Sequence, residues 1–293
     1  MHNVSPGLTA GSGLKQFERE TMTKCAAIQM ASSPNVEANL IEAERLITAA
    51  ADAGARLIVL PENFACMGMS EFDKLGIRED DHSGPIQGFL ARMAQQHSAW
   101  IVGGTVPMTS RSPDKARASC LVYDDRGHRV ARYDKIHLFD VDVPGSDERH
   151  RESNTIEGGD RPVVLKTPFG NLGVAICYDL RFPELFRSML DDGMEILVVP
   201  AAFTAETGAA HWELLVRARA VENLCYVIAA DQGGFHLNNR RTYGGSMIVD
   251  PWGEVLSRLA NGAGHACAEI DLSRLYKVRE TFPVLQHRRL ICQ

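Results

Sequence analysis

Short apolar runs alternate with amphipathic segments along the chain, and this alternation limits its fold more than any other sequence feature. Residues 24–30 and 55–62 are strand-like, and residues 36–54 between them have helical apolar spacing that ends at a glycine. The pattern repeats with a helix over residues 85–98 and a strand over residues 99–107. Such repetition predicts a largely buried sheet with helices packed outside it.

The middle of the chain adds antiparallel strands. Residues 118–135 have the alternation of a hairpin, whereas residues 136–161 lack any period and predict a long loop of functional importance. Strand-like and helix-like runs then continue to a last helix over residues 272–280, and no linker-like composition divides the two halves. We therefore predict an α/β fold in one domain over residues 23–293, a four-layer α-β-β-α sandwich of two mixed sheets. In the second half, the predicted elements are a strand pair over 167–179, helices over 181–193 and 208–223, strands over 194–203 and 224–232, and three more strands before residue 270.

The N-terminal residues, the lengths of the apolar runs and the balance of charged residues indicate where the protein is located and what it binds. Residues 1–22 mix Gly, Ser, Thr and Pro without a hydrophobic period, which predicts a flexible leader, either native or added for expression. They lack the apolar core of a signal peptide, and the longest apolar stretch, residues 196–203, is far shorter than the ~18–20 residues of a membrane helix. With 31 basic and 37 acidic residues and no long basic run, nucleic acid is not an expected partner. We expect a cytoplasmic protein without membrane or nucleic-acid partners.

Cysteine spacing and missing motifs argue against metals and cofactors. The chain has seven cysteines, no two closer than 25 residues, which excludes CxxC redox and zinc spacings and disfavours a disulfide framework. P-loop, dinucleotide and HExxH motifs are absent. We expect no metal and no cofactor.

Three polar residues stand where apolar strands are predicted to end. Glu62 ends the second strand, Lys135 ends the hairpin, and Cys177 ends a run that precedes a helix. Active sites of α/β proteins are commonly built at strand ends. Alone, each residue reads as a solvated charge or a core thiol. Together they are the parts of an acyl-transfer site, with a nucleophile, a general base and a fixed positive charge.

Six segments of the sequence resemble the nitrilase (carbon–nitrogen hydrolase) superfamily, in order, over residues 24 to about 290. That resemblance implies a Glu-Lys-Cys triad on Glu62, Lys135 and Cys177, with a second active-site glutamate at Glu152. It also implies the α-β-β-α sandwich, homodimers or higher oligomers, and no cofactor. The matching segments are LPENFACMG, YDKIHLFDVDVPG, RESNTIEGGD, GVAICYDLRFPEL, TGAAHWELLVRARAVEN and YGGSMIVDPWGEV.

The expected chemistry is thioester formation on Cys177. Lys135 and the following helix start should lower the pKa of the thiol. Lys135 and the backbone N–H of Tyr178 would bind the oxyanion, and Glu62 would move the protons. Glu152 is expected to hold Lys135 and orient the amide, the alternative being a carboxylate at the rim of an acidic loop.

The residues after Cys177 bear on specificity. Tyr178 stands where nitrile-hydrolysing members usually have Trp, which disfavours nitriles. Arg181 can present a planar fork to a substrate carboxylate, unless Glu184 or Asp179 neutralises it at the surface.

Three further residues are candidates for the pocket wall. Phe203 follows an apolar strand, and His211 begins the HWE run of the next predicted helix. His211 could equally serve capping and packing. Cys66 lies four residues after Glu62, and a plain buried thiol is the alternative reading.

The predicted function is a cofactor-independent amidase for a small carboxylate-bearing amide. Within the amidase branch, the PVLQHRR and AFTAETGAAHWE runs favour deaminated glutathione, cleaved to 2-oxoglutarate and cysteinylglycine. The KIHLFDVDVPG loop also fits an ω-amidase that acts on α-ketoglutaramate, and N-carbamoyl amino acids remain a third substrate class. A non-catalytic partner-binding member and a thiol redox sensor are the alternatives from other functional classes.

Overall fold

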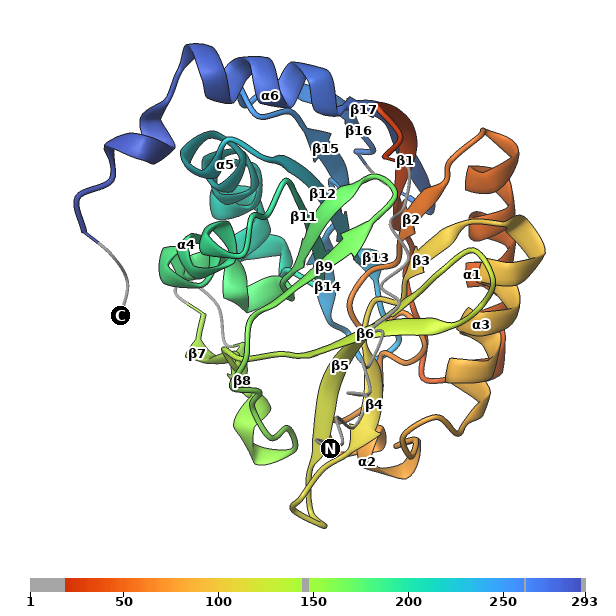
Figure 1. The fold of residues 1–293 in the computed structure, drawn as a ribbon. Coiled ribbons are helices and arrows are strands. Elements are labelled where there is room, and N and C mark those ends of the chain that lie inside the picture. The colour runs from red at the N-terminus through yellow and green to blue at the C-terminus, as the bar shows by residue number, and fades with distance from the viewer. Residues whose placement is uncertain (1–18, 144–147, 261, 291–293) are drawn as a thin grey trace, which may run out of the picture.

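The structure of the protein is a computed structural model, which describes residues 19–143, 148–260 and 262–290. Two mixed sheets form its centre (Figure 1). The first has the strand order β17-β1-β2-β3-β5-β4, with β6 paired to β5. Its strands are β1 (Met22–Gln29), β2 (Leu57–Val59), β3 (Trp100–Val102), β4 (Val106–Thr109), β5 (Ala116–Tyr123), β6 (Arg129–Asp134) and β17 (Gly264–Asp271).

The second sheet has the order β16-β15-β12-β11-β10-β9. Strands β10, β11 and β12 run parallel, β9 is antiparallel to β10, β15 is antiparallel to β12, and β16 is antiparallel to β15. A small separate hairpin follows β12. The strands are β9 (Val163–Thr167), β10 (Gly170–Val174), β11 (Ile196–Ala201), β12 (Tyr226–Asp231), β15 (Met247–Val249) and β16 (Val255–Arg258), and the hairpin is β13 (Gly233–Phe235) with β14 (Arg241–Tyr243).

Helices lie on the outer face of each sheet (Figure 1). The first sheet is covered by α1 (Val36–Asp52) and α3 (Pro85–His97), and the second by α4 (Pro183–Asp191) and α5 (Ala205–Asn223). Helix α6 (Leu272–Thr281) follows β17, and the short α2 (Asp73–Gly76) lies in the connection after β2. No helix in these three described ranges is long and apolar enough to cross a membrane.

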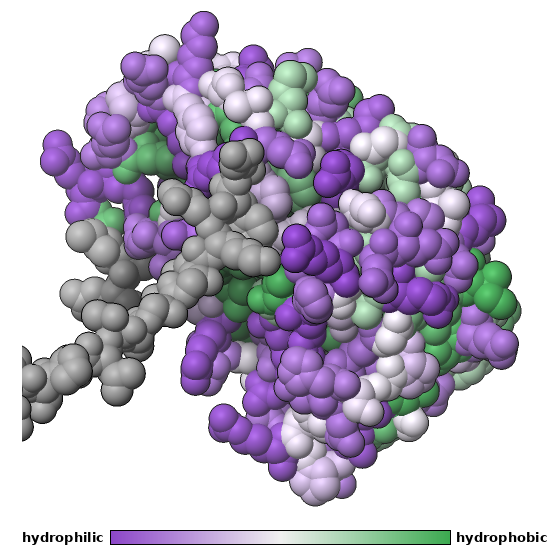
Figure 2. Space-filling view, turned by 45° about the vertical axis from the view of Figure 1, so that its right-hand side comes forward, coloured by the Kyte–Doolittle hydropathy of each residue, from purple (hydrophilic) through white to green (hydrophobic). Residues whose placement is uncertain are grey.

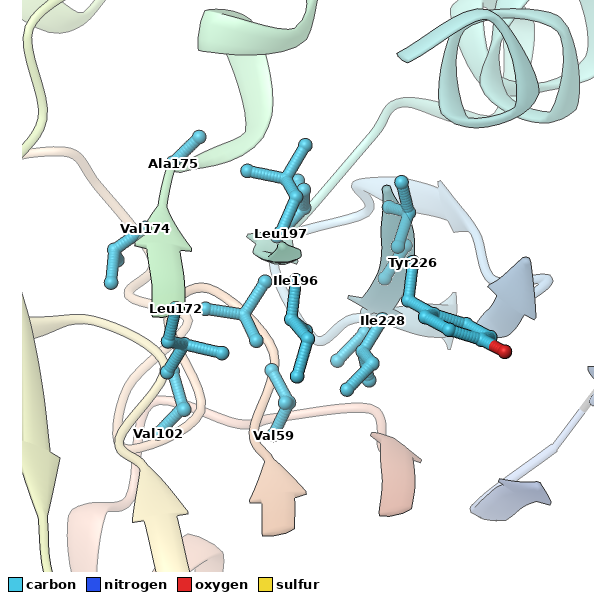
Figure 3. Close-up of a cluster of buried hydrophobic side chains, with 14 of the residues drawn as sticks. Val59, Val102, Leu172, Val174, Ala175, Ile196, Leu197, Tyr226 and Ile228 are labelled. Atoms are coloured by element: carbon cyan, nitrogen blue, oxygen red, sulfur yellow. The ribbon is translucent and has the colours of Figure 1, made fainter. Parts of the chain in front are cut away.

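Alternation along the strands produces the layers. In β1 and β2, Ala26 and Ile58 pack with α1 and α3, whereas Ala27 and Val59 pack against the second sheet. Figure 3 shows Val59 pointing toward side chains of the second sheet, among them Ile196. The predicted four-layer sandwich is therefore confirmed. Hydrophilic residues cover most of the face in Figure 2, where apolar areas are small and separate.

The structure changes several of the predicted elements, and the three strands expected between residues 232 and 270 are five in the described ranges, β13 to β17. The strand expected over residues 99–107 is two strands, because Gly104 turns the chain with a φ of +52° between β3 and β4. The loop over residues 136–161 contains a hairpin of β7 (Asp140–Asp142) and β8 (Arg149–Arg151). Helix α5 begins three residues earlier than predicted, where the Thr204 hydroxyl caps it by accepting from the N–H of Thr207.

The predicted leader lies mostly outside the described residues, which begin at Arg19. Strand β1 already starts at Met22, and the Arg19 guanidinium pairs with Glu195 at 3.1 Å and donates to the Tyr276 hydroxyl. Residues 19–22 thus belong to the folded part rather than to the leader predicted over residues 1–22.

Candidate active site

A buried cluster of three charged side chains lies at the ends of two strands of the first sheet. Lys135, directly after β6, donates from Nζ to Glu62 Oε1 at 2.8 Å and to Glu152 Oε2 at 2.8 Å. Glu62 follows β2, and Glu152 opens the 3₁₀ turn η1 (Glu152–Asn154) after the β7–β8 hairpin. The Lys135 side chain is only 2% exposed. Since a buried charge needs a partner, these three groups hold one another in place.

Cys177 comes from the other sheet and completes the group. It begins the 3₁₀ turn η2 (Cys177–Arg181) just beyond β10, with a φ of +46°, a conformation that non-glycine residues rarely adopt. Buried Asp179 fixes this turn by accepting hydrogen bonds from the Ile176 N–H at 2.8 Å and the Tyr133 hydroxyl at 2.7 Å. The thiol lines the same pocket as the Glu62 carboxylate and lies close enough for that carboxylate to raise the thiol pKa. The turn therefore aims the sulfur at the charged cluster.

The pKa of Cys177 differs from the sequence expectation. Burial raises the pKa of the thiol well above its ordinary value, and the Glu62 carboxylate raises it further, while Lys135 lowers it. The expectation of a lowered pKa was wrong, because burial of the thiol and the Glu62 carboxylate together outweigh Lys135. A thiol of this kind needs a base at the moment of attack.

Glu62 has the properties of that base. Burial by itself would raise the pKa of its carboxyl, but Lys135 outweighs burial and holds the pKa below its usual range. Burial would likewise lower the pKa of Lys135, yet Glu152 and Glu62 together raise it well above its ordinary value. At neutral pH the resting site thus holds a carboxylate, an ammonium ion and a protonated thiol.

A pocket opens over this cluster, and it contains most of the residues predicted from the sequence. Tyr178 and Phe203 line it together with the four groups above. The Arg181 guanidinium also lines it and lies over the rings of Tyr178 and Phe203, at 5.8 and 5.6 Å from their centroids. No carboxylate in the described part of the chain forms an ion pair with Arg181, so neither Glu184 nor Asp179 neutralises it.

Two predicted residues have other places. His211 is exposed on α5 outside the pocket lining, and its Nδ1 lies 3.3 Å from the Arg181 guanidinium nitrogens. It contacts the pocket only through Arg181. Cys66 is buried outside the lining, with its thiol directed at the Pro34 carbonyl at 3.7 Å, which agrees with the plain reading of a buried thiol.

Sequence reasoning missed the residues that support the base and widen the pocket. The Gln232 amide donates to the Glu62 carbonyl at 3.0 Å and to the Ser32 hydroxyl at 2.7 Å, so it fixes the backbone of Glu62. Lys74 and Arg240 also line the pocket. These residues come from loops and a short helix without a sequence period, and only the fold brings them to Glu62.

The described residues contain no group of three or more His, Cys, Asp and Glu side chains placed to hold a metal ion. The charged groups clustered beside the Cys177 thiol are the carboxylates of Glu62 and Glu152 and the ammonium of Lys135.

Iodoacetamide is expected to inactivate the protein by alkylating Cys177. Of the six described cysteines, which are all free thiols, only Cys177 lines the pocket beside a base. Burial raises the pKa of the Cys66, Cys177 and Cys225 thiols, that of Cys225 to about 12, so we expect the carboxylate beside Cys177, and not a lower pKa, to make this thiol reactive. Peptide mass mapping during inactivation at pH ~7.5, below the ordinary thiol pKa, checks this. Activity loss that follows labelling of Cys66 or Cys292 instead would contradict the assignment.

Comparison with known proteins places this site in a family. The carbon–nitrogen hydrolase family model matches residues 24–280. A deaminated glutathione amidase of Synechocystis is 46% identical over 266 residues, which cover 90% of this chain and 97% of the relative. The deaminated glutathione amidases of Yersinia enterocolitica and Mus musculus are 42% and 40% identical, covering 91% and 90% of this chain and 93% and 82% of the relatives.

Solved structures agree with the sequence matches. The Caenorhabditis elegans NitFhit protein superposes with a TM-score of 0.85 and 36% identity, over 92% of this chain and 66% of that one. Saccharomyces cerevisiae Nit3, a member of branch 10 of the nitrilase superfamily, gives a TM-score of 0.84 and 30% identity, over 94% and 99%. A family match that spans the sheets, the charged cluster and Cys177 leads to one conclusion: this chain is an enzyme of the carbon–nitrogen hydrolase family.

Proposed function

We propose that this enzyme is an amidase that cleaves deaminated glutathione into 2-oxoglutarate and cysteinylglycine through a thioester on Cys177. The observation that carries the proposal is the buried Glu62–Lys135–Glu152 cluster beside the Cys177 thiol, in a pocket that also holds Arg181, a cation with which no carboxylate of the described residues pairs. The names of the relatives support the choice of substrate.

The first half of the proposed reaction forms the thioester. Glu62 takes the thiol proton as Cys177 Sγ attacks the amide carbon. One N–H of Lys135 turns to the developing oxyanion while the others stay on Glu62 and Glu152, and the Tyr178 N–H, at the start of the turn, is the second donor. When the oxyanion collapses, Glu62 gives its proton to the nitrogen and the amine leaves.

The second half hydrolyses the thioester. Glu62, again a carboxylate, takes a proton from water, and the hydroxide attacks the thioester carbon at the same oxyanion site. Collapse expels the thiolate of Cys177, which regains its proton from Glu62. Glu152 acts as a positioning residue, since its carboxylate accepts from Lys135 and from the Phe139 N–H at 2.7 Å.

A substrate panel tests the proposal. The wild-type enzyme is incubated with deaminated glutathione, α-ketoglutaramate and an N-carbamoyl amino acid, and the released amine or ammonia is measured. We expect the highest kcat/KM on deaminated glutathione. A higher value on α-ketoglutaramate would make the enzyme an ω-amidase, which the KIHLFDVDVPG loop also fits, and no turnover of any amide would favour a non-catalytic role.

Arg181→Lys is expected to lower kcat/KM on α-keto-acid amides by about 30-fold or more, because an ammonium loses the bidentate fork that pairs with a carboxylate. Hydrolysis of a simple neutral amide, which is slow from the start, should change little. His211→Ala is the matched control, since it removes a contact of Arg181 outside the pocket and should cost much less. Equal losses on both kinds of amide would make Arg181 a structural residue.

The homodimer and the cytoplasmic location belong to the same proposal. Six free thiols are typical of a reducing compartment, which supports the cytoplasm. The dimer is supported by exposed apolar side chains beside α5. Trp252 and Phe282 are 59% and 48% exposed, and their ring centroids lie 5.4 Å apart. Val221 of α5 is 46% exposed.

Trp252→Glu is expected to convert the dimer to a monomer, because it puts a charge into an apolar contact. Size-exclusion chromatography with light scattering measures the mass of both forms against the 32.2 kDa chain. Val130→Glu, at an exposed position of β6 away from α5, is the control and should leave the mass unchanged. A wild-type mass of one chain would contradict the dimer.

A further inference from the structure

The pocket over Cys177 continues into a second hollow, and four residues line both. These are Glu71, Lys74, His150 and Arg240. The second hollow, here called the outer groove, is also lined by residues 67–70, 148–149 and 238–239. Arg181 lines the pocket but not the outer groove. The site therefore has positive charge in two places, at Arg181 and at the mouth of the outer groove.

Lys74 and Arg240 are the two cations at this mouth. Within the described ranges neither Lys74 nor Arg240 forms an ion pair. Arg240 donates from Nη2 to the Ala202 carbonyl at 2.9 Å, and its buried Nε has no hydrogen-bond partner among the described residues. Ala202 also lines the pocket, so this contact holds the guanidinium close to the reaction centre.

Negative groups face the same mouth but are engaged by His150. Its imidazole lies 3.3 Å from Glu148 and 3.9 Å from Glu71. His150 is the largest influence on the Glu71 carboxyl and lowers its pKa, with smaller contributions from Lys74 and Arg240. With Arg149 also in the groove lining, cations outnumber carboxylates there.

We propose that Lys74 and Arg240 bind a carboxylate on the leaving-group side of the scissile amide. This inference rests on the proposed function. When the reacting carbon lies at Cys177 and the α-keto acid carboxylate at Arg181, the leaving amine extends toward the outer groove. Cysteinylglycine ends in a carboxylate, whereas the leaving group of α-ketoglutaramate is ammonia. The two cations would thus select amides with a second carboxylate, distant from the first.

The test compares three substrates that differ on the leaving-group side alone. They are deaminated glutathione, its analogue with the glycine carboxylate converted to the primary amide, and α-ketoglutaramate. The wild-type enzyme should favour the free acid over the amide analogue by about tenfold or more in kcat/KM, mostly through KM, and salt should weaken this preference. Lys74→Met should remove about tenfold of kcat/KM on the free acid and leave the two other substrates nearly unchanged.

Two further variants sharpen the result. Arg240→Ala should also lower kcat/KM on the free acid. Because this change also removes the hydrogen bond to the Ala202 carbonyl, it can lower the turnover of all three substrates. Lys74→Met is therefore the variant that decides the test. Lys277→Ala, an exposed helix lysine outside both hollows, is the matched control and should leave all three values unchanged.

The outcomes separate this inference from the proposed function. If the wild-type enzyme cleaves deaminated glutathione but Lys74→Met lowers activity on all three substrates alike, or on none, the leaving-group site is wrong and the proposed function stands. A loss confined to α-ketoglutaramate, which has no carboxylate on its leaving group, would also overturn the inference. If the wild-type enzyme does not cleave deaminated glutathione, both proposals fail.

Discussion

Glu62→Gln is expected to lower kcat by about 10³-fold or more, because one carboxylate performs each proton transfer of the proposed cycle and the amide that replaces it accepts no proton. The change is isosteric, and the amide oxygen can still accept from Lys135. The fold should therefore survive, which circular dichroism and a urea unfolding curve check. Glu269→Gln, at an exposed position of β17, is the matched control and should keep full activity.

We expect the same residue to set the pH dependence of the wild-type enzyme. The pKa of Glu62 lies below its ordinary value of 4.5, and the pKa of the Cys177 thiol lies well above its ordinary 9.0. The reactive pair, carboxylate with protonated thiol, therefore dominates across the neutral range. We expect kcat/KM to stay level from about pH 8 down to about pH 5 and to fall only below that. An acid limb near pH ~6–7, or a Glu62→Gln variant with more than about a tenth of the wild-type kcat, would remove Glu62 from this role.

Lys135→Met is expected to abolish measurable turnover, with a loss of at least about 10²- to 10³-fold from the missing oxyanion donor alone. A second loss follows, because without the ammonium the pKa of Glu62 rises and the base becomes protonated at neutral pH. Steady-state assays at several pH values measure both effects. Lys166→Met, at an exposed position of β9, is the control and should behave as wild type. Retention of a tenth of the activity would contradict the role of Lys135.

Lys135→Met should also destabilise the fold in a pH-dependent way. Removing one partner of a buried ion pair costs about 3–5 kcal/mol, because the other charges are left buried and unpaired. In the variant, the pKa of the Glu62 carboxyl lies higher in the folded than in the unfolded state, so the folded state binds its proton more tightly and stability falls as pH rises through that interval. Urea unfolding at about pH 5 and about pH 8 should show the larger deficit at the higher pH. Adding Glu152→Gln should recover stability at the higher pH without recovering kcat.

The geometry of the nucleophile shows a limit of reasoning from residue types. Cys177 beside a lysine predicted a lowered thiol pKa, and the structure gives the opposite direction. Burial of the thiol is the largest cause, the Glu62 carboxylate adds to it, and Lys135, whose ammonium donates to Glu62 and Glu152 at 2.8 Å, lowers the pKa by less. Sequence identifies which charges are present, but the distances among them and their burial decide which one dominates the pKa.

The sequence alone determined the layers and the reactive groups. Apolar alternation sets which face of each strand is buried, and Glu62, Lys135 and Cys177 are recognisable because polar groups interrupt apolar runs where strands end. The tertiary structure decided how far the site extends. Lys74 and Arg240 lie in segments without periodicity and 166 residues apart in the chain, and only the packing of the two sheets brings them into one pocket. Their role depends on side chains far away in sequence, and no local pattern encodes such a contact.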